Sequence, residues 1–190
     1  MEERLTGAFV ALGTFDGLHL GHKAVITAEK TEYQRKIALM FTHHPQVDLK
    51  GENPGVLITE SKEKSVLEEW GVTPQYLDFS EICELSPEDF VDNVLIKKYN
   101  AKSLACGFNY RFGKNAEGTS DTLLRLCAER EIKLTVVDAV EYENEPVSST
   151  RIRKALRDGD MKSVKAMLGR YFSYNFSIMT IFYPIHQSTI

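Results

Sequence analysis

Ten residues near the N-terminus constrain the fold more than any other stretch: Gly13-Thr14-Phe15-Asp16-Gly17-Leu18-His19-Leu20-Gly21-His22. The apolar run at 8–12 before them predicts a buried parallel strand, and residues 23–35 read as a helix. Glycines in a strand-to-helix turn allow positive φ and close approach of a ligand. A helix start offers unpaired N–H groups that favour phosphate. Because two histidines three residues apart share one side of a helix, the turn is predicted to bind anionic oxygens.

The residues of this turn are compatible with more than one role. The stretch has neither the G-x-G-x-x-G spacing of dinucleotide-binding folds nor the G-x-x-x-x-G-K-[ST] spacing of P-loops. A glycine-rich turn with a chance histidine pair is one alternative. A zinc site is another, although no third ligand has a spacing that would join His19 and His22.

Composition sets broad limits on function. The chain has 190 residues, enough for one domain with a sizeable core. Its net charge of −4 argues against nucleic-acid binding. Cys83, Cys106 and Cys127 form no metal-binding pattern and read as small core residues in a reducing compartment. The charged N-terminus precedes no signal-peptide core, so we expect a cytoplasmic protein that does not enter a membrane.

Strand and helix patterns alternate along the rest of the chain. Short apolar runs predict strands at 37–41, 75–79, 103–106 and 134–137, in addition to 8–12. Capping residues and apolar periodicity predict helices at 62–70 after Ser61, from Ser86 to about 99, at 121–130, from Ser148 or Ser149, and from Asp160 to Gly169. This order predicts an α/β fold with about five parallel strands and helices on both faces. The loop at 46–59 would lie at the carboxyl edge of the sheet, where ligands bind in such folds.

Four separated segments together resemble a known family. They are residues 13–22, Phe41-Thr42-His43-His44-Pro45, Gly107-Phe108-Asn109-Tyr110-Arg111-Phe112-Gly113 and Ser148-Ser149-Thr150-Arg151-Ile152-Arg153. His19-Leu20-Gly21-His22 matches the H-x-G-H signature of the nucleotidylyltransferase superfamily, which implies a Rossmann-like fold. In order and wording, the four segments closely resemble the FMN adenylyltransferase module of bacterial FAD synthetases over about residues 8–170.

The resemblance implies a reaction and its small-molecule substrates. ATP and FMN would give FAD and pyrophosphate, with Mg²⁺ expected on the nucleotide phosphates and its protein ligands unassigned. The FMN phosphate would attack the α-phosphorus of ATP in line, so the protein would supply positioning and charge stabilisation. Two alternatives remain: another H-x-G-H nucleotidyltransferase, such as a cytidylyltransferase, or a non-catalytic relative that binds flavin or nucleotide.

The resemblance also implies roles for individual residues. The ATP site would comprise Gly13, Thr14, Phe15, Asp16, Gly17, His19, Gly21, His22, Ser148, Ser149, Thr150 and Arg153. The FMN site would comprise Phe41, His43, Pro45, Asn109 and Arg111. The residues expected to act in catalysis are His19, His22, Asn109 and Arg153. From the residues alone, Arg111 can equally be a surface charge, Phe112 a core residue and the arginines after Ser148 a solvated helix face.

The end of the chain differs from the two-domain members of the family. Residues 1–170 are expected to form the adenylyltransferase domain. Residues 171–190 contain no Asp, Glu, Lys, Arg or Gly and would form a short tail in place of a riboflavin kinase domain. We therefore expect no riboflavin kinase activity, because no carboxylate or glycine remains there to hold magnesium and phosphates.

Overall fold

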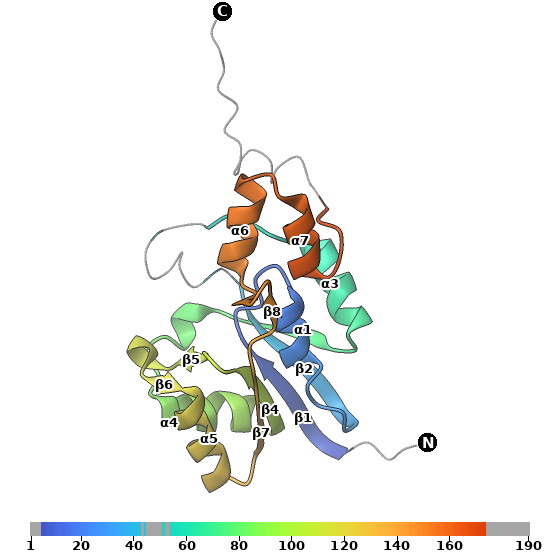
Figure 1. Cartoon of the computed structure of the whole chain (residues 1–190). Coiled ribbons are helices and arrows are strands. Elements are labelled where there is room, and N and C mark those ends of the chain that lie inside the picture. The colour runs from blue at the N-terminus through green and yellow to red at the C-terminus, as the bar shows by residue number, and fades with distance from the viewer. Residues whose placement is uncertain (1–4, 43, 45–50, 52–53, 174–190) are drawn as a thin grey trace, which may run out of the picture.

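A computed structural model describes residues 5–42, 44, 51 and 54–173. Its centre is a five-stranded parallel sheet in the order β3-β2-β1-β4-β7 (Figure 1). The strands are β1 (Leu5–Leu12), β2 (Tyr33–Phe41), β3 (Thr73–Leu77), β4 (Ala101–Gly107) and β7 (Lys133–Val137). The predicted parallel α/β sheet is confirmed, and the strand that precedes the turn at 13–22 lies at its middle.

Helices cover both faces of this sheet, as predicted. They are α1 (Leu20–Ile26), α3 (Glu60–Glu69), α4 (Pro87–Asp89) running into a wide π-type helix (Phe90–Lys98), α5 (Ser120–Glu129), α6 (Ser149–Arg157) and α7 (Met161–Leu168). Two small antiparallel pairs, β5 (Arg111–Phe112) with β6 (Gly118–Thr119) and β8 (Glu141–Tyr142) with β9 (Glu145–Pro146), lie outside the sheet. Single 3₁₀ turns span Phe79–Glu81 and Lys114–Ala116.

The alternation of side chains along β1 explains the two-layer core. Ala8, Val10 and Leu12 pack with the helices at 87–98 and 120–129, whereas Phe9 and Ala11 pack with α1 and α3. All five side chains are almost completely buried, as expected for a central parallel strand covered on both sides.

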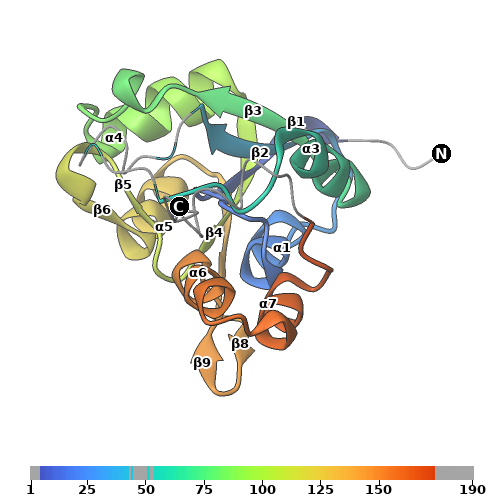
Figure 2. The ribbon, with the colours of Figure 1, turned by 90° about the horizontal axis from the view of Figure 1, so that it is seen from above.

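The two C-terminal helices form a third layer. Ile152 and Leu156 of α6 pack on Val164 and Met167 of α7 and on Leu57 of the segment before α3. Figure 1 shows α6 and α7 beyond the end of the sheet that lies away from the N-terminus. Seen from above in Figure 2, they stand beside α1, on the α1 side of the sheet. This layer is therefore placed against the turn at 13–22.

The first helix departs from the prediction. The sequence pattern predicts a helix over 23–35, but α1 ends at Ile26, and β2 already begins at Tyr33. Thr27 caps α1, with its hydroxyl donating to the Lys23 carbonyl at 2.8 Å. Two residues later, the buried Glu29 carboxylate accepts from Ser103 Oγ at 2.6 Å and Lys133 Nζ at 2.9 Å. These long-range bonds fix an extended exit that helical periodicity does not reveal.

Several other boundaries differ from the prediction by smaller amounts. Thr59 rather than Ser61 caps α3, and β3 covers Thr73–Leu77 rather than 75–79. Ser86 caps its helix as predicted, Ser148 is the cap among the two serines considered, and the predicted helix start near Asp160 is confirmed. His43, Pro45 and the tail at 174–190 lie outside the described residues. Among the described residues, no helix has the length and apolar character that a membrane crossing requires.

Candidate active site

The turn between β1 and α1, called here the Gly–His turn (residues 13–22), has an unusual backbone. Phe15, Gly17 and Leu18 have φ values of 51°, 78° and 44°, so left-handed conformations crowd into four residues. The Phe15 and Leu18 side chains are fully buried despite this conformation. Such strain persists only where the surroundings impose it, so the turn is held in shape by its packing.

His19 and His22 form a stacked pair at the start of α1. His19 is the N-cap, and its Nδ1 accepts from the His22 backbone N–H at 3.3 Å. The two ring centroids are 3.6 Å apart at an interplanar angle of 17°. A Cβ at Gly21 would stand 3.1 Å from His19 Cε1, so a side chain at this position would press on the His19 ring. Phe15 meets the His22 ring edge-on at 5.4 Å.

Both imidazoles are neutral at pH 7. Burial, assisted by the positive charge of Arg170, lowers the pKa of His19 to about 4. Burial also lowers the pKa of His22 well below its ordinary value, with His19 and Arg170 acting in the same direction. Because His19 Nδ1 is an acceptor, the proton of this ring sits on Nε2, which can donate. His22 Nδ1 is buried without a hydrogen-bond partner among the described residues.

The start of α6 is attached to the Gly–His turn. The Ser149 hydroxyl donates to the Asp16 carbonyl at 2.8 Å, and Arg153 Nη1 lies 2.7 Å from Asp16 Oδ2. Ser148 caps α6 by accepting from the Arg151 backbone N–H. Thr150 and Thr14 are exposed beside these contacts. The structure thus brings the two sequence-predicted ATP segments together.

Arg153 differs in one respect from its expected place on ATP phosphates. It is buried, and besides Asp16 it bonds the carbonyls of Pro54 (2.7 Å, from Nε) and Gly55 (from Nη2). All three guanidinium nitrogens therefore contact protein acceptors. Its phosphate-binding role stays a prediction. In the structure Arg153 acts as a clamp that connects α6 with the turn and with the segment before α3.

Two residues of the site are not apparent from the sequence pattern. His44 Nε2 lies 3.9 Å from Asp16 Oδ2, and burial lowers its pKa. Arg170 donates to the carbonyls of Gly17 and Leu18 at 2.7 Å each. The histidine belongs to the motif that starts at Phe41, and that motif is the signal that could have found it. Nothing in local sequence places an arginine after the last helix onto a turn 150 residues earlier.

Two of the predicted flavin-side residues lie in a more open segment, the aromatic loop (residues 107–113). Asn109 and Arg111 are exposed, whereas Tyr110 stacks on the buried Phe112 at 5.6 Å. The interpretation of Phe112 as a core residue is therefore confirmed. Phe41, at the carboxyl end of β2, is half-buried against Phe79. Neither Phe41 nor the two exposed residues show by contact what they bind, so their flavin roles stay predictions.

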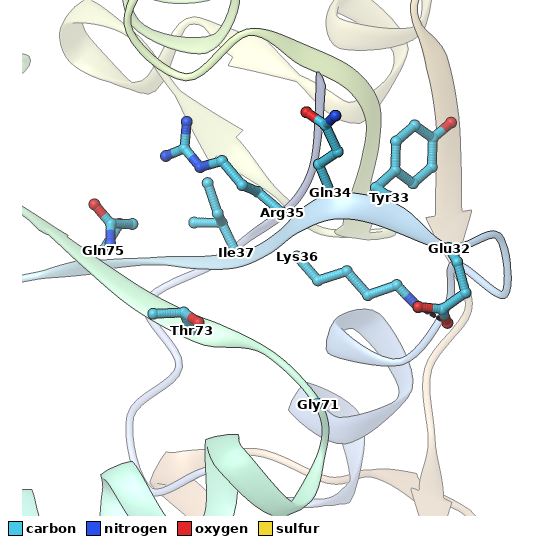
Figure 3. Close-up of a pocket in the computed structure, with 9 residues that line it drawn as sticks. All are labelled: Glu32, Tyr33, Gln34, Arg35, Lys36, Ile37, Gly71, Thr73 and Gln75. Atoms are coloured by element: carbon cyan, nitrogen blue, oxygen red, sulfur yellow. Dashed lines mark hydrogen bonds and ion pairs between the residues drawn. The ribbon is translucent and has the colours of Figure 1, made fainter. Parts of the chain in front are cut away.

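A hollow at the opposite end of the sheet lies away from all these residues. Figure 3 shows its lining residues at the starts of β2 and β3. Its volume is about 300 Å³. Its lining residues are Glu32, Tyr33, Gln34, Arg35, Lys36, Ile37, Gly71, Thr73 and Gln75. Lys36 pairs with Glu32 at 2.8 Å within it. Ligands of open α/β sheets bind at the carboxyl ends of strands, so this amino-end hollow is not the candidate site.

The sequence pattern assigns no metal ligands. Over the described residues, no group of three or more His, Cys, Asp or Glu side chains is arranged to hold a metal ion. Asp16, the carboxylate of the Gly–His turn, is already paired with Arg153. A resident metal therefore does not fit the described side chains, and Mg²⁺ would accompany the nucleotide substrate.

Comparison with known proteins agrees with the geometry. A Listeria monocytogenes protein named bifunctional riboflavin kinase/FMN adenylyltransferase is 34% identical over 168 residues, covering 84% of this chain and 53% of that protein. A Listeria protein named FAD synthetase is 31% identical over 169 residues, covering 85% and 68%. A crystal structure described as a macrolide-efflux protein from Streptococcus pneumoniae superposes with a TM-score of 0.77 at 29% identity, covering 90% and 67%.

The matches cover most of this chain but only part of its relatives. The chain spans about half the length of the first curated relatives that it matches. A sequence model described as FAD synthetase matches residues 1–151, which include the Gly–His turn, the aromatic loop and the start of α6. With the parallel sheet, the H-x-G-H turn and this match in agreement, the chain belongs to the FAD synthetase family.

Proposed function

We propose that this chain is an FMN adenylyltransferase, which converts ATP and FMN into FAD and pyrophosphate. The observation that carries the proposal is the neutral, stacked pair of the buried His19 and the partly buried His22 at the start of α1, in a chain of the FAD synthetase family. We assign the activity to residues 1–170, because the clamp residues of α6 and the segment after α7 complete the surroundings of this pair.

The reaction balances without a covalent enzyme intermediate. An oxygen of the FMN phosphate forms a bond to the α-phosphorus of ATP while the bond between that phosphorus and the bridging α–β oxygen breaks. Pyrophosphate leaves with the electron pair. Mg²⁺ accompanies ATP as the MgATP substrate. In such transfers the protein contributes positioning and stabilisation of charge on phosphate oxygens.

Neutral imidazoles suit this task. His19 donates through Nε2, because its Nδ1 already accepts from the His22 N–H. Since its pKa is about 4, this donor keeps one defined protonation state throughout the physiological range. Hydrogen-bond donors fixed in a buried site gain most as negative charge develops on the leaving group. His22, stacked on His19 and backed by Phe15, is pre-oriented in the same way.

The second phosphate contact in the proposal is the start of α6. Ser149 ties this helix to Asp16 of the turn, so that the beginnings of α1 and α6 approach each other. Helix N-termini attract phosphate through free N–H groups and the helix dipole. We place the α-phosphate near His19 and His22 and the leaving phosphates toward Ser149 and Thr150. Arg153 then acts mainly by holding Asp16 and the segment at 54–55 in place.

The flavin would occupy the side of the aromatic loop. Asn109 follows β4, the immediate neighbour of β1, so its side chain lies at the same edge of the sheet as the Gly–His turn. In the proposal Asn109 approaches the reacting phosphate of FMN, and Arg111 with Phe41 contacts the flavin nucleotide. The exposure of Asn109 and Arg111 supports this, because these groups are accessible to a bulky ligand.

The direct test is incubation of the purified chain with MgATP and FMN. We expect FAD by chromatography and pyrophosphate in equal amount, and none of either from the His19→Ala/His22→Ala double variant prepared in parallel. Replacing ATP by CTP should abolish turnover. Folded protein that releases no pyrophosphate from ATP and FMN would refute the proposal. Preference for CTP would indicate another nucleotidyltransferase, and flavin binding without turnover a non-catalytic relative.

A further inference from the structure

The segment after α7 folds back onto the Gly–His turn. Gly169 ends α7 with φ of 70°, a left-handed conformation that turns the chain toward α1. A Cβ at Gly169 would stand 2.5 Å from Leu20 Cδ2, so the backbone passes closely over the first residue of α1. As a result Arg170, the next residue, lies against the turn that carries His19.

Arg170 forms hydrogen bonds to two successive carbonyls of that turn. Its Nη2 donates to Gly17 O and its Nη1 to Leu18 O, both at 2.7 Å, while Nη1 also reaches Leu168 O at 3.2 Å. Gly17 and Leu18 are two of the residues with positive φ, and Leu18 immediately precedes His19. The planar fork of a guanidinium can satisfy two diverging acceptors at once, which an ammonium cannot do with the same geometry.

The charge of Arg170 faces the histidine pair. Arg170 acts on both His19 and His22, His19 acts in addition on His22, and Glu69 of α3 acts in turn on Arg170. Arg170 is half-buried, and the acceptors that it contacts are neutral carbonyls. A cation held in this way repels a proton on either imidazole. It therefore favours the neutral rings on which the proposed reaction depends.

We propose that Arg170 is a positioning residue of the active site: by holding the Gly17 and Leu18 carbonyls it fixes the strained turn and, through it, the direction of His19 and His22. Arg170 lies outside the segment matched by the family model, residues 1–151. The proposal rests on the proposed adenylyl transfer for its kinetic consequence. Its structural consequence, an altered histidine pair, does not depend on any reaction.

The kinetic test compares Arg170→Ala, Arg170→Lys and the control Arg125→Ala. Arg125 is an exposed arginine on α5 that pairs with Glu88 and Glu129, so its loss changes the net charge equally at a distance. Because small displacements of catalytic groups cost up to about 100-fold in rate, we expect kcat of Arg170→Ala to fall by about that factor, with KM for ATP changed less than about threefold. The lysine variant should recover only part of the loss.

The second test needs neither ATP nor FMN. Ring resonances of ¹⁵N-histidine in the free protein report the imidazole pKa values. We expect His19 to titrate near 4 in the wild type and at a higher pH in Arg170→Ala, and to stay low in Arg170→Lys, which keeps the charge. The comparison separates the effect of the Arg170 charge from that of its hydrogen bonds to the two carbonyls. In the lysine variant His19 should titrate as in the wild type, whereas kcat should be lower.

The outcomes decide between a positioning and a merely structural role. Wild-type kcat in folded Arg170→Lys would show that the hydrogen bonds to the two carbonyls are unnecessary and would overturn the proposal. So would unchanged histidine titration together with unchanged kcat in Arg170→Ala. If Arg170→Ala fails to fold by circular dichroism, the lysine variant carries the decision. If the wild type makes no FAD, the proposed function fails, while the histidine titrations still test the contact of Arg170 with the turn.

Discussion

The Gly–His turn and the aromatic loop follow neighbouring strands of one sheet, yet they are built in opposite ways. The turn is anchored from distant parts of the chain, by Ser149, Arg153 and Arg170, and its large apolar side chains are buried. The aromatic loop is held by backbone bonds, such as Tyr110 N–H to the Gly107 carbonyl and Phe108 N–H to the Val137 carbonyl, and it exposes Asn109 and Arg111.

This contrast matches the two tasks in the proposed reaction. Stabilising charge on phosphates requires donors that do not reorganise during the reaction, and the anchored turn supplies them. Admitting a flavin nucleotide requires accessible groups that can adjust to a large ligand. We therefore expect changes in the turn to act on kcat and on folding stability, and changes in the aromatic loop to act mainly on KM for FMN.

The largest effect should come from His22→Ala. Removing a donor that stabilises transition-state charge costs roughly 10²–10³ in kcat, about 3–4 kcal/mol. The affinity for FMN should change little, because His22 belongs to the turn. Steady-state kinetics and FMN titration of the same preparation measure both. His22→Gln keeps an N–H donor and serves as the partner variant. Near-normal kcat in the alanine variant would show that His22 only contributes to packing. The expected difference between the turn, which acts on kcat, and the aromatic loop, which acts on KM for FMN, would then have no basis.

The sequence predicted the turn better than it predicted its anchors. Glycine spacing, the preceding apolar run and the histidine pair are local signals. They correctly predicted a strand followed by a helix, and the anion-binding site that they indicate stays a prediction. The contacts of Arg170 with Gly17, of Arg153 with Pro54 and of Glu29 with Ser103 join residues far apart in sequence. Local periodicity carries no information on such long-range pairs. These contacts, and the end of α1 near Glu29, were therefore not predicted.

Acidification should destabilise the turn in a defined pH range. His19 has an ordinary pKa of 6.5 that burial lowers to about 4 in the folded protein. Between these values the unfolded chain binds a proton that the folded chain does not, so the free energy of unfolding decreases as pH falls from about 6.5 to 4. One pKa unit corresponds to 1.36 kcal/mol, giving a loss of about 3 kcal/mol from this residue. His22 acts in the same direction.

Urea unfolding at several pH values measures this loss, and His19→Gln provides the reference. The wild-type curve should lose stability more steeply than that of the glutamine variant between pH 6.5 and 4. The aromatic loop contains no histidine, so Arg111→Ala should follow the wild-type profile. Parallel profiles for the wild type and His19→Gln would mean that the His19 ring is not buried as described.

A somewhat smaller effect is expected from Arg153→Ala. This change leaves Asp16 without its ion-pair partner in a site where both side chains are mostly buried. Breaking a fully buried pair costs 3–5 kcal/mol, and partial exposure of Asp16 reduces the expected loss of unfolding free energy to about 2–3 kcal/mol. ATP affinity should fall more than FMN affinity, because the clamp fixes the ATP side of the site.

The double variant Asp16→Asn/Arg153→Ala tests the cause of this loss. Removing the stranded charge should restore part of the stability, since the penalty of an unpaired carboxylate is then absent. Calorimetric titration with ATP and FMN separates the two affinities. If Arg153→Ala weakens FMN binding more than ATP binding, the Arg153 clamp lies on the flavin side. The assignment of ATP to the turn and of FMN to the aromatic loop would then be wrong.

The smallest effect should come from Arg111→Ala, in the aromatic loop. Arg111 is exposed, and an exposed charge contributes about 1 kcal/mol or less to a contact, screened further by salt. We expect KM for FMN to rise about threefold to fivefold at low ionic strength, kcat to stay within about twofold, and the difference to shrink in high salt. Lys114→Ala, which removes a neighbouring exposed cation paired with Glu84, is the matched control and should leave KM unchanged. A fall in kcat comparable to that of His22→Ala would place Arg111 on the reacting phosphates, and the aromatic loop would then share the charge stabilisation assigned here to the anchored turn.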